Sequence, residues 1–269
     1  MPLYHILILA LIQGLTEFLP VSSSGHLVLS HYLLGNNNLD LCWETNRIID
    51  VAVHVGTLFS VLVYFRKDLI KIACGITNPQ SDGFKLFKHI MIASIPVIIA
   101  GFIIQQYQFS LLCMVEIMAW LMLFFGVVLW FADKFDSNKT LEKMSNGNAF
   151  VIGLSQALAL IPGVSRSGIT MTSARFLGFS RVEAARFSLL LSIIAISGAG
   201  TLSGLDLIQE DSILFGADIF IAFILSFLSG WIAITLMIKW LSKATFLPFV
   251  IYRIILGSGL LILIYSGVL

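Results

Sequence analysis

The stretch that decides the fold is Gln13-Gly-Leu-Thr-Glu17-Phe-Leu-Pro-Val-Ser-Ser-Ser-Gly-His26, in the middle of the apolar segment 3–34. A membrane-spanning helix needs about 20 mostly apolar residues. The segment is long enough, but a proline, two glycines and three consecutive serines interrupt it. Polar groups that face hydrocarbon without a partner cost several kcal/mol each. We therefore expect this stretch to be buried in protein or to line a wet cavity.

A second apolar segment, residues 149–174, is interrupted in the same way. Its centre reads Gln156-Ala-Leu-Ala-Leu-Ile-Pro-Gly-Val-Ser-Arg-Ser-Gly168. It shares with the first stretch the glutamine, a leucine, the proline and the closing Ser-x-Ser-Gly, with a shift of one residue around the proline. The two segments therefore resemble two copies of one element.

The composition is that of an integral membrane protein. Of 269 residues, 58% are apolar and 12% are charged, which is more apolar surface than a water-soluble domain of this length can hide. A net charge of +1 argues against a nucleic-acid partner, which would require a basic face. Membrane lipids are the expected surroundings. Six stretches qualify as uninterrupted spans, at residues 48–65, 90–106, 111–131, 186–204, 218–238 and 249–267.

The distribution of lysine and arginine predicts the topology, because short cytoplasmic connections carry the excess of positive charge. The connections at 106–110 and 204–217 lack both residues and are expected outside. Segment 149–174 has a basic connection on each side, so it must enter and leave on one face as a re-entrant hairpin. Segment 3–34 is expected to form a second hairpin that enters from the outside. The basic, cytoplasmic connections are 66–88, 133–148, 175–186 and 239–253.

The order is then hairpin, three spans, hairpin, three spans. An odd number of spans between the hairpins inverts the second unit relative to the first. We predict an all-α integral membrane fold with six spanning helices and two re-entrant helical hairpins, arranged as an inverted repeat. The chain would form a single membrane domain, with repeat 1 at about 1–133 and repeat 2 at about 149–269. Broken elements of such repeats meet near the midplane and form the functional site.

Glu17, His26 and Arg166 are ionisable residues inside the interrupted segments. Such groups are costly in a membrane unless they are paired or hydrated, so an intramembrane site is the first hypothesis for them. A simpler alternative is that Glu17 and Arg166 form a buried pair that only pins the two hairpins together. The neighbouring serines, the threonine and the histidine favour a site, because a pinning pair does not need them.

The second segment has the features of an oxyanion receptor. Gly163, Gly168 and the Ser-Arg-Ser run allow a turn with converging backbone N–H groups, and a guanidinium offers forked donors that match phosphate oxygens. The positive end of the helix that follows could face the same anion. The hydroxyl groups expected to help bind the phosphate are those of Ser165, Ser167 and Thr170, together with Ser22 and Ser24 of the first segment.

The first segment carries the candidates for reaction chemistry. His26 lies three residues after Ser23 and nine after Glu17, so Glu17 could orient the imidazole while Ser23 stays within reach. Two roles fit: His26 as a nucleophile toward phosphorus, or as the base that activates Ser23 or a water molecule. Two further candidates for the lining of the pocket are Gln13 and His54.

Two other classes of function compete with an enzyme. Inverted repeats with broken elements are also used by secondary transporters, in which Arg166 would bind an anionic substrate without breaking it. A flippase that moves a phosphorylated lipid lies between the two classes. His26 beside Ser23 favours the enzyme, because a transporter needs no nucleophile.

The two interrupted stretches resemble the signature regions of the bacterial undecaprenyl-diphosphate phosphatase family, the bacitracin-resistance type. The resemblance covers nearly the whole chain, including Asp50-Val-Ala-Val-His-Val-Gly-Thr-Leu58 and Phe246-Leu-Pro-Phe-Val-Ile-Tyr-Arg253. It implies a polyprenyl diphosphate substrate, hydrolysed to the monophosphate and inorganic phosphate, in the bacterial cytoplasmic (inner) membrane. It further implies a role in recycling the lipid carrier for peptidoglycan synthesis and in bacitracin resistance, and it leaves a homodimer open.

The resemblance also implies a set of pocket residues and a metal ion, Mg²⁺ or Ca²⁺. The family's Glu-x-x-x-Glu pattern has Gln13 at its first position here, which removes one carboxylate from a two-carboxylate metal clamp. Glu17, substrate phosphates and water could still hold one Mg²⁺, which commonly keeps several waters. The pocket residues carried over by position are Glu17, Ser22, Ser23, His26, Ser165, Arg166, Ser167 and Thr170.

Overall fold

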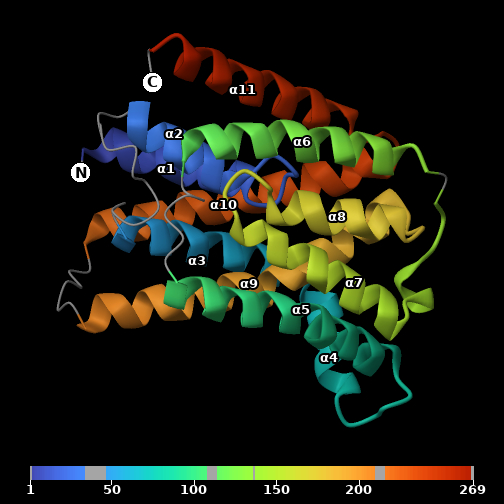
Figure 1. Cartoon of the computed structure of the whole chain (residues 1–269). Helices are drawn as coiled ribbons and strands as arrows, with labels where there is room; N and C mark the ends of the chain where they lie inside the picture. Colours follow the sequence, from blue (N-terminus) through green and yellow to red (C-terminus); the bar gives the residue numbers. More distant parts are fainter. Residues whose placement is uncertain (1, 34–46, 108–113, 136, 210–215, 268–269) are drawn as a thin grey trace.

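The computed structural model describes residues 2–33, 47–107, 114–135, 137–209 and 216–267. Within these ranges the regular elements are helices, apart from one isolated bridge between Lys139 and Phe179. Figure 1 shows the long helices lying side by side, with the two ends of the chain at the same end of the molecule.

The predicted spans are present as helices. They are α3 (Arg47–Tyr64), α5 (Asp82–Tyr107), α6 (Val115–Asp133), α9 (Arg181–Gln209), α10 (Ala217–Leu241) and α11 (Leu247–Tyr265). Among the described residues, five helices are long and apolar enough to cross a membrane. The sixth span is α3 taken together with α4 (Arg66–Gly75), which bends away from it by 73°. The chain is therefore a multi-pass membrane protein, and its described residues contain five candidate spans or, counting the bent pair, six.

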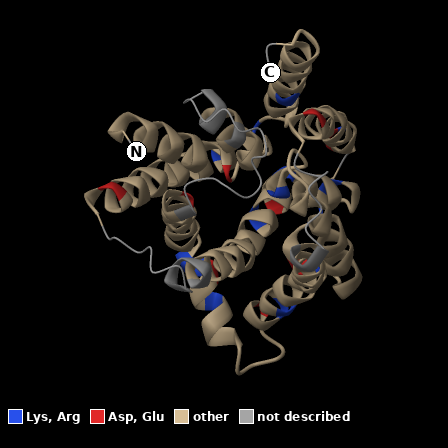
Figure 2. Ribbon diagram, turned by 60° about the vertical axis from the view of Figure 1, so that its left-hand side comes forward, with Lys and Arg blue, Asp and Glu red and all other residues tan. Residues whose placement is uncertain are grey.

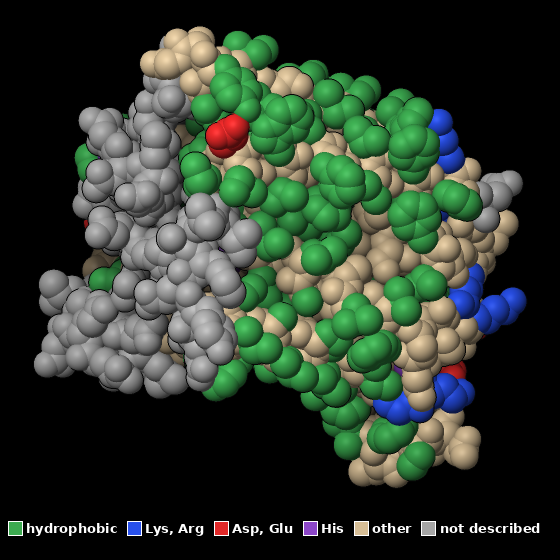
Figure 3. All heavy atoms as spheres, viewed as in Figure 1, with side chains coloured by type: hydrophobic (Ala, Val, Ile, Leu, Met, Phe, Trp, Pro, Cys, Tyr) green, Lys and Arg blue, Asp and Glu red, His purple; other side chains and the backbone are tan. Residues whose placement is uncertain are grey.

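The outer surface agrees with a lipid environment. Figure 3 shows hydrophobic side chains covering the middle of one face, with lysine and arginine gathered at one end. Large apolar side chains such as Ile98, Phe124 and Trp231 are exposed. In Figure 2 the ribbons carry few charged positions along their length. Burying such side chains in lipid removes apolar surface from water, which is the dominant favourable term in membrane insertion.

The four basic connections lie together at that end. Arg186 forms an ion pair with Asp68, so the start of α9 lies beside α4. Arg181 pairs with Asp133 at the end of α6, and the same carboxylate accepts a hydrogen bond from the backbone of Phe246, which precedes α11. One end of the molecule therefore carries all the stretches that the charge pattern assigned to the cytoplasm.

Both interrupted segments are helix, break, helix. The first consists of α1 (Leu3–Thr16) and α2 (Ser23–Leu33), and the second of α7 (Asn146–Ala157), the 3-10 turn η3 (Leu158–Leu160) and α8 (Arg166–Phe176). We call residues 17–22 the first break and residues 161–165 the second break. α1 contacts α2, and α7 contacts α8. Figure 1 shows the two breaks meeting in the middle of the molecule, with α1 and α2 extending to one end and α7 and α8 to the other.

The two breaks share an uncommon backbone conformation. Ser22 has φ 76° and Ser165 has φ 71°, and they are the only non-glycine residues with positive φ in the described part of the chain. Each precedes a helix by one position and approaches the hydroxyl of the serine two residues on at 3.2 Å. Left-handed non-glycine residues cost of order 1 kcal/mol and persist where surrounding contacts fix them. The similarity seen in the sequence thus extends to backbone geometry.

A candidate intramembrane active site

Glu17 and Arg166 join the two breaks. Glu17 directly follows α1, and Arg166 is the first residue of α8. An Nη2 atom of the guanidinium lies 2.8 Å from Oε1 of the carboxylate, and the two side chains are 13% (Arg166) and 8% (Glu17) exposed. Arg166 also donates to the carbonyl oxygen of Ser188 on α9. The structure therefore brings together two residues that are 149 positions apart.

The second carboxylate oxygen of Glu17 is also occupied. Oε2 accepts a hydrogen bond from the Ser23 hydroxyl at 2.7 Å and another from the side-chain amide of Gln13 at 2.9 Å. Charge-assisted bonds of this kind are stronger than neutral ones, so the carboxylate fixes Arg166, Ser23 and Gln13 around it. His54 on α3 hydrogen-bonds through Nδ1 to the carbonyl oxygen of Asp50 on its own helix, at 2.6 Å.

His26 points to a different neighbour. Its Nδ1 atom lies 2.7 Å from the carbonyl oxygen of Ser22, and its Nε2 atom lies 2.5 Å from the hydroxyl of Tyr252 on α11. Neither Ser23 nor Glu17 hydrogen-bonds to His26 within the described ranges. The expectation that Glu17 orients His26 therefore does not hold in this structure. At the start of α2 the Ser23 hydroxyl turns toward Glu17, whereas the His26 ring turns toward α11.

The hydroxyl groups of the second segment are bonded within the protein. Ser165 caps α8, where its hydroxyl accepts from the backbone of Gly168, and Ser167 donates to the carbonyl oxygen of Leu19 at 2.8 Å. Thr170 lies 2.7 Å from the hydroxyl of Ser188. All three are buried, as is Ser22, whereas Ser24 is exposed. In this structure these groups fasten the breaks to each other and to α9, whereas Arg166, between Ser165 and Ser167, is partly exposed.

Gly163 sets the path of the second break. Its φ of 93° is in the region that favours glycine. A Cβ atom at this position would lie 2.4 Å from the carbonyl oxygen of Met118 on α6. Because residue 163 has no side chain, the backbone of the second break can lie directly against α6.

Arg253 is a residue whose place the sequence did not reveal. It was counted among the basic residues of the connection 239–253, but it is fully buried on α11. Its position seven residues into an apolar helix was the available signal, because an isolated charge there must face the protein interior. Its guanidinium donates to five carbonyl oxygens, two on α6 and three in the breaks: Met122, Leu121, Pro20, Val164 and Gly163.

A metal ion could be held only by a small donor set. No group of three or more histidine, cysteine, aspartate or glutamate side chains is placed to bind a metal in the described part of the chain. Oε1 of Gln13 is buried without a hydrogen-bond partner there, next to Glu17. Mg²⁺ often takes one or two protein oxygens and completes its shell with water and phosphate. Gln13 and Glu17 fit that mode of binding and do not fit a cage made of protein ligands alone.

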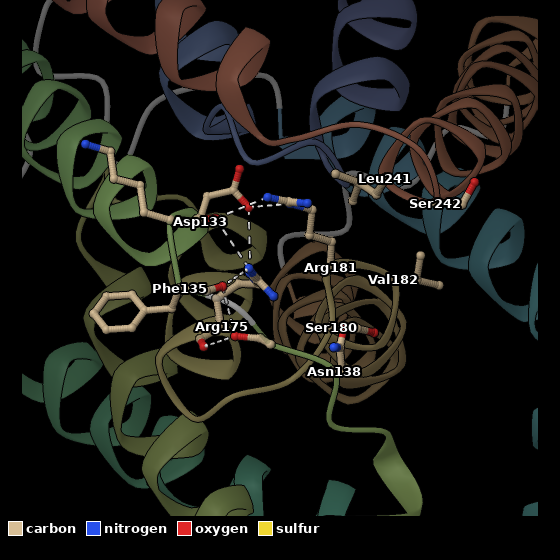
Figure 4. Close-up of a pocket in the computed structure, with 11 residues that line it drawn as sticks. Asp133, Phe135, Asn138, Arg175, Ser180, Arg181, Val182, Leu241 and Ser242 are labelled. Atoms are coloured by element: carbon tan, nitrogen blue, oxygen red, sulfur yellow. Dashed lines mark hydrogen bonds and ion pairs between the residues drawn. The ribbon is translucent and has the colours of Figure 1, made fainter.

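A polar pocket of about 280 Å³ lies at the basic end and contains none of the predicted site residues. Figure 4 shows Asp133 and Arg181 on one of its walls with Arg175 nearby. Asp133 is 2.6 Å from Arg181 and 3.7 Å from the almost fully buried Arg175, and it accepts from the backbone of Phe246 at 2.9 Å. The carboxylate thus ties the end of α6 to α8, α9 and the start of α11.

Replacing Asp133 by alanine is expected to lower the stability of the folded protein by about 3–5 kcal/mol, because a buried guanidinium loses its counter-charge. Thermal unfolding in detergent, followed by tryptophan fluorescence, measures the effect. Asp82→Ala is the control, since Asp82 pairs with Lys85 at a site where its side chain is 82% exposed, and exposed pairs contribute little. Equal unfolding temperatures for the two variants would show that Asp133 does not hold this end together.

Comparison with known proteins gives a consistent picture. The family model described as bacitracin resistance protein BacA matches residues 6–259. A protein named undecaprenyl-diphosphatase from Saccharophagus degradans is 44% identical over 271 residues, covering 98% of this chain and 99% of the relative. A protein of the same name from Hahella chejuensis is 43% identical, and the match covers 97% of this chain and 98% of the relative. Another from Roseobacter denitrificans is also 43% identical, and the match covers 99% of this chain and 100% of the relative.

Proposed function

The chain belongs to the bacitracin resistance protein BacA family and is an undecaprenyl-diphosphatase, and from this premise we propose that it acts where its two breaks meet. The reaction is hydrolysis of undecaprenyl diphosphate to undecaprenyl phosphate and inorganic phosphate. The observation that carries the site is the Glu17–Arg166 pair, an ionised centre between two hydroxyl-rich breaks inside a membrane protein. Such intramembrane charges mark functional sites.

Each residue of the centre has a chemical task in this proposal. Phosphoryl transfer needs positioned donors, neutralisation of charge and an attacking group in line. Arg166 binds the phosphate oxygens with its fork of N–H donors, and Glu17 holds that fork in place. Nε2 of His26 either attacks the terminal phosphorus, which forms a phosphohistidine that water then hydrolyses to inorganic phosphate, or takes a proton from the attacking water. The bond that breaks joins the terminal phosphorus to the bridging oxygen, which leaves with undecaprenyl phosphate.

We also propose that Gln13 and Glu17 hold Mg²⁺ or Ca²⁺ with the help of substrate phosphates and water. The unpartnered Oε1 of Gln13 beside Glu17 supports this assignment. When bound, the ion would neutralise charge on the diphosphate and polarise its phosphoryl oxygens. Gln13 contributes an uncharged oxygen, and Glu17 contributes the only carboxylate of this pair.

We infer that the two broken segments are re-entrant hairpins and that the fold is an inverted repeat, with units at about 1–133 and 149–269. The helix packing supports the inference. α1 packs on α10, and correspondingly α7 packs on α5. In addition, α3 packs on α9, and α6 packs on α11. Exchanging α1 with α7, α5 with α10, α3 with α9 and α6 with α11 reproduces this pattern. In the bacterial cytoplasmic membrane, the basic end would face the cytoplasm.

The reaction is tested by phosphate release from undecaprenyl diphosphate by the purified protein in detergent. We expect release by the parental chain and about tenfold slower release by Ser23→Ala, which loses one hydrogen bond to Glu17. Binding of the lipid without release would favour a transporter or flippase. Complete loss of release in Ser23→Ala would instead assign the attacking oxygen to Ser23. A Thr235→Ala chain is the control, since that exposed hydroxyl bonds only to its own helix.

A further inference from the structure

Tyr252 occupies the reactive face of His26. Its hydroxyl oxygen lies 2.5 Å from Nε2, and the two rings are nearly parallel, with an interplanar angle of 8° and centroids 5.5 Å apart. The two residues are 226 positions apart and come from α2 and α11. Neither the motifs nor the family resemblance assigned a role to Tyr252.

The hydrogen bonds around His26 fix the direction of this contact. The Ser22 carbonyl can only accept, so Nδ1 of His26 must carry a proton. In a neutral imidazole, Nε2 then carries the lone pair, and the Tyr252 hydroxyl is the donor. Nε2 is therefore both the nitrogen that could attack phosphorus or take a proton and the nitrogen to which the Tyr252 hydroxyl is bonded.

The phenol is able to move, whereas His26 is held. His26 is 8% exposed, and the hydrogen bond from Nδ1 to the Ser22 carbonyl oxygen holds its ring independently of Tyr252. Tyr252 is 43% exposed, so its ring has room to rotate. Its backbone is fixed, because the next residue, Arg253, is bonded to both breaks. The Tyr252 side chain can therefore move off Nε2 of His26, while its fixed backbone keeps the hydroxyl close to that nitrogen.

We propose that the Tyr252 hydroxyl, which caps Nε2 of His26 in this structure, donates to a phosphate oxygen once a diphosphate displaces it from that nitrogen. The proposal rests on the proposed function, because it takes Nε2 as the reacting atom. A phosphoryl group that approaches Nε2 must break the bond to the phenol. The released hydroxyl is then within hydrogen-bonding reach of the oxygens of that group, since it lay 2.5 Å from the same nitrogen.

The cap is tested without turnover by carbethoxylation of histidine, with Tyr252→Phe as the variant. Phenylalanine keeps the ring and removes only the hydroxyl. We expect His26 to be modified several-fold faster in the variant than in the parental chain, as measured by mass spectrometry of peptides. Tyr265→Phe is the matched control, because Tyr265 lies on the same helix and donates to Glu116 instead. His5 and His89 serve as internal references whose rates should not change.

Turnover tests the second half of the proposal. The value of kcat/KM for undecaprenyl diphosphate should fall about tenfold in Tyr252→Phe, as for the loss of one hydrogen bond to the reacting group. An unchanged rate of His26 modification would overturn the cap, and faster modification with unchanged kcat/KM would overturn the donation to phosphate. If the parental chain released no phosphate, the proposed function would fail, while carbethoxylation would still report on the cap.

Discussion

A chain in which Glu17 and Arg166 are both changed to glutamine is expected to fold and yet to release phosphate at least about 10²-fold more slowly than the parental chain. The two amides can still hydrogen-bond to each other across the breaks. They cannot neutralise the charge of a diphosphate, because the guanidinium that would bind its oxygens is gone. Purified double variant and parental chain are compared by phosphate release and by thermal unfolding.

The double variant separates a functional pair from a pinning pair. Arg166→Gln alone leaves the Glu17 carboxylate buried without its cation, which is expected to cost about 3–5 kcal/mol of stability and to confuse the two roles. Removing both charges avoids that loss. If the pair only pins the breaks, the double variant will keep near-parental activity. Asp82→Asn/Lys85→Gln, which removes an exposed ion pair, should change neither stability nor activity.

Arg253→Met is expected to destabilise the protein by about 3–5 kcal/mol and to abolish phosphate release in the same preparation, because each buried carbonyl oxygen left without a donor costs about 1–3 kcal/mol. The variant removes the Arg253 donor from five carbonyl oxygens, of which the two inside α6 still accept the backbone hydrogen bonds of that helix. Three of them lie in the two breaks, so the loss falls on the backbone that presents Glu17 and Arg166. The stability and activity of Arg253→Lys should lie between those of Arg253→Met and those of the parental chain, because lysine keeps the charge but offers three donors in place of five.

Unfolding temperature and phosphate release are measured on each Arg253 variant. Arg66→Met is the control, because Arg66 bonds a single carbonyl oxygen, that of Val63, at an exposed site. An Arg253→Met chain that unfolds at the parental temperature would show that the two breaks are held together by other contacts. Ser167, which donates to Leu19 across the breaks, would then be the next candidate.

Much of the fold was predictable because lipid imposes simple rules. Every predicted span coincides with a helix, since apolar length alone selects them, and both breaks fall where Pro20 and Pro162 interrupt an apolar run. The bend between α3 and α4 was not predicted. It occurs at Phe65, where the sequence has neither proline nor glycine. α9 begins at Arg181, ahead of its predicted apolar start, because a helix can continue beyond the membrane into a polar connection.

The candidate site was predictable in part. The repeated Ser-x-Ser-Gly pattern indicated that two distant segments share one element, and the structure places Glu17 beside Arg166. The partners of His26 could not be found in the same way. Tyr252 reaches it from α11, and such a contact depends on how whole helices pack, which local patterns do not encode. Arg253 was misplaced for a related reason, since a count of charges does not distinguish a residue in a connection from one inside the adjacent helix.

The position of Arg253 in the chain also bears on biogenesis. The carbonyl groups of Val164 and Pro20 are synthesised 89 and 233 residues before the side chain that binds them. A nascent chain that has inserted every helix up to α10 already contains both breaks but lacks Arg253, which bonds to both of them. The hydrogen bonds from Arg253 to the two breaks can therefore form only after α11 is inserted.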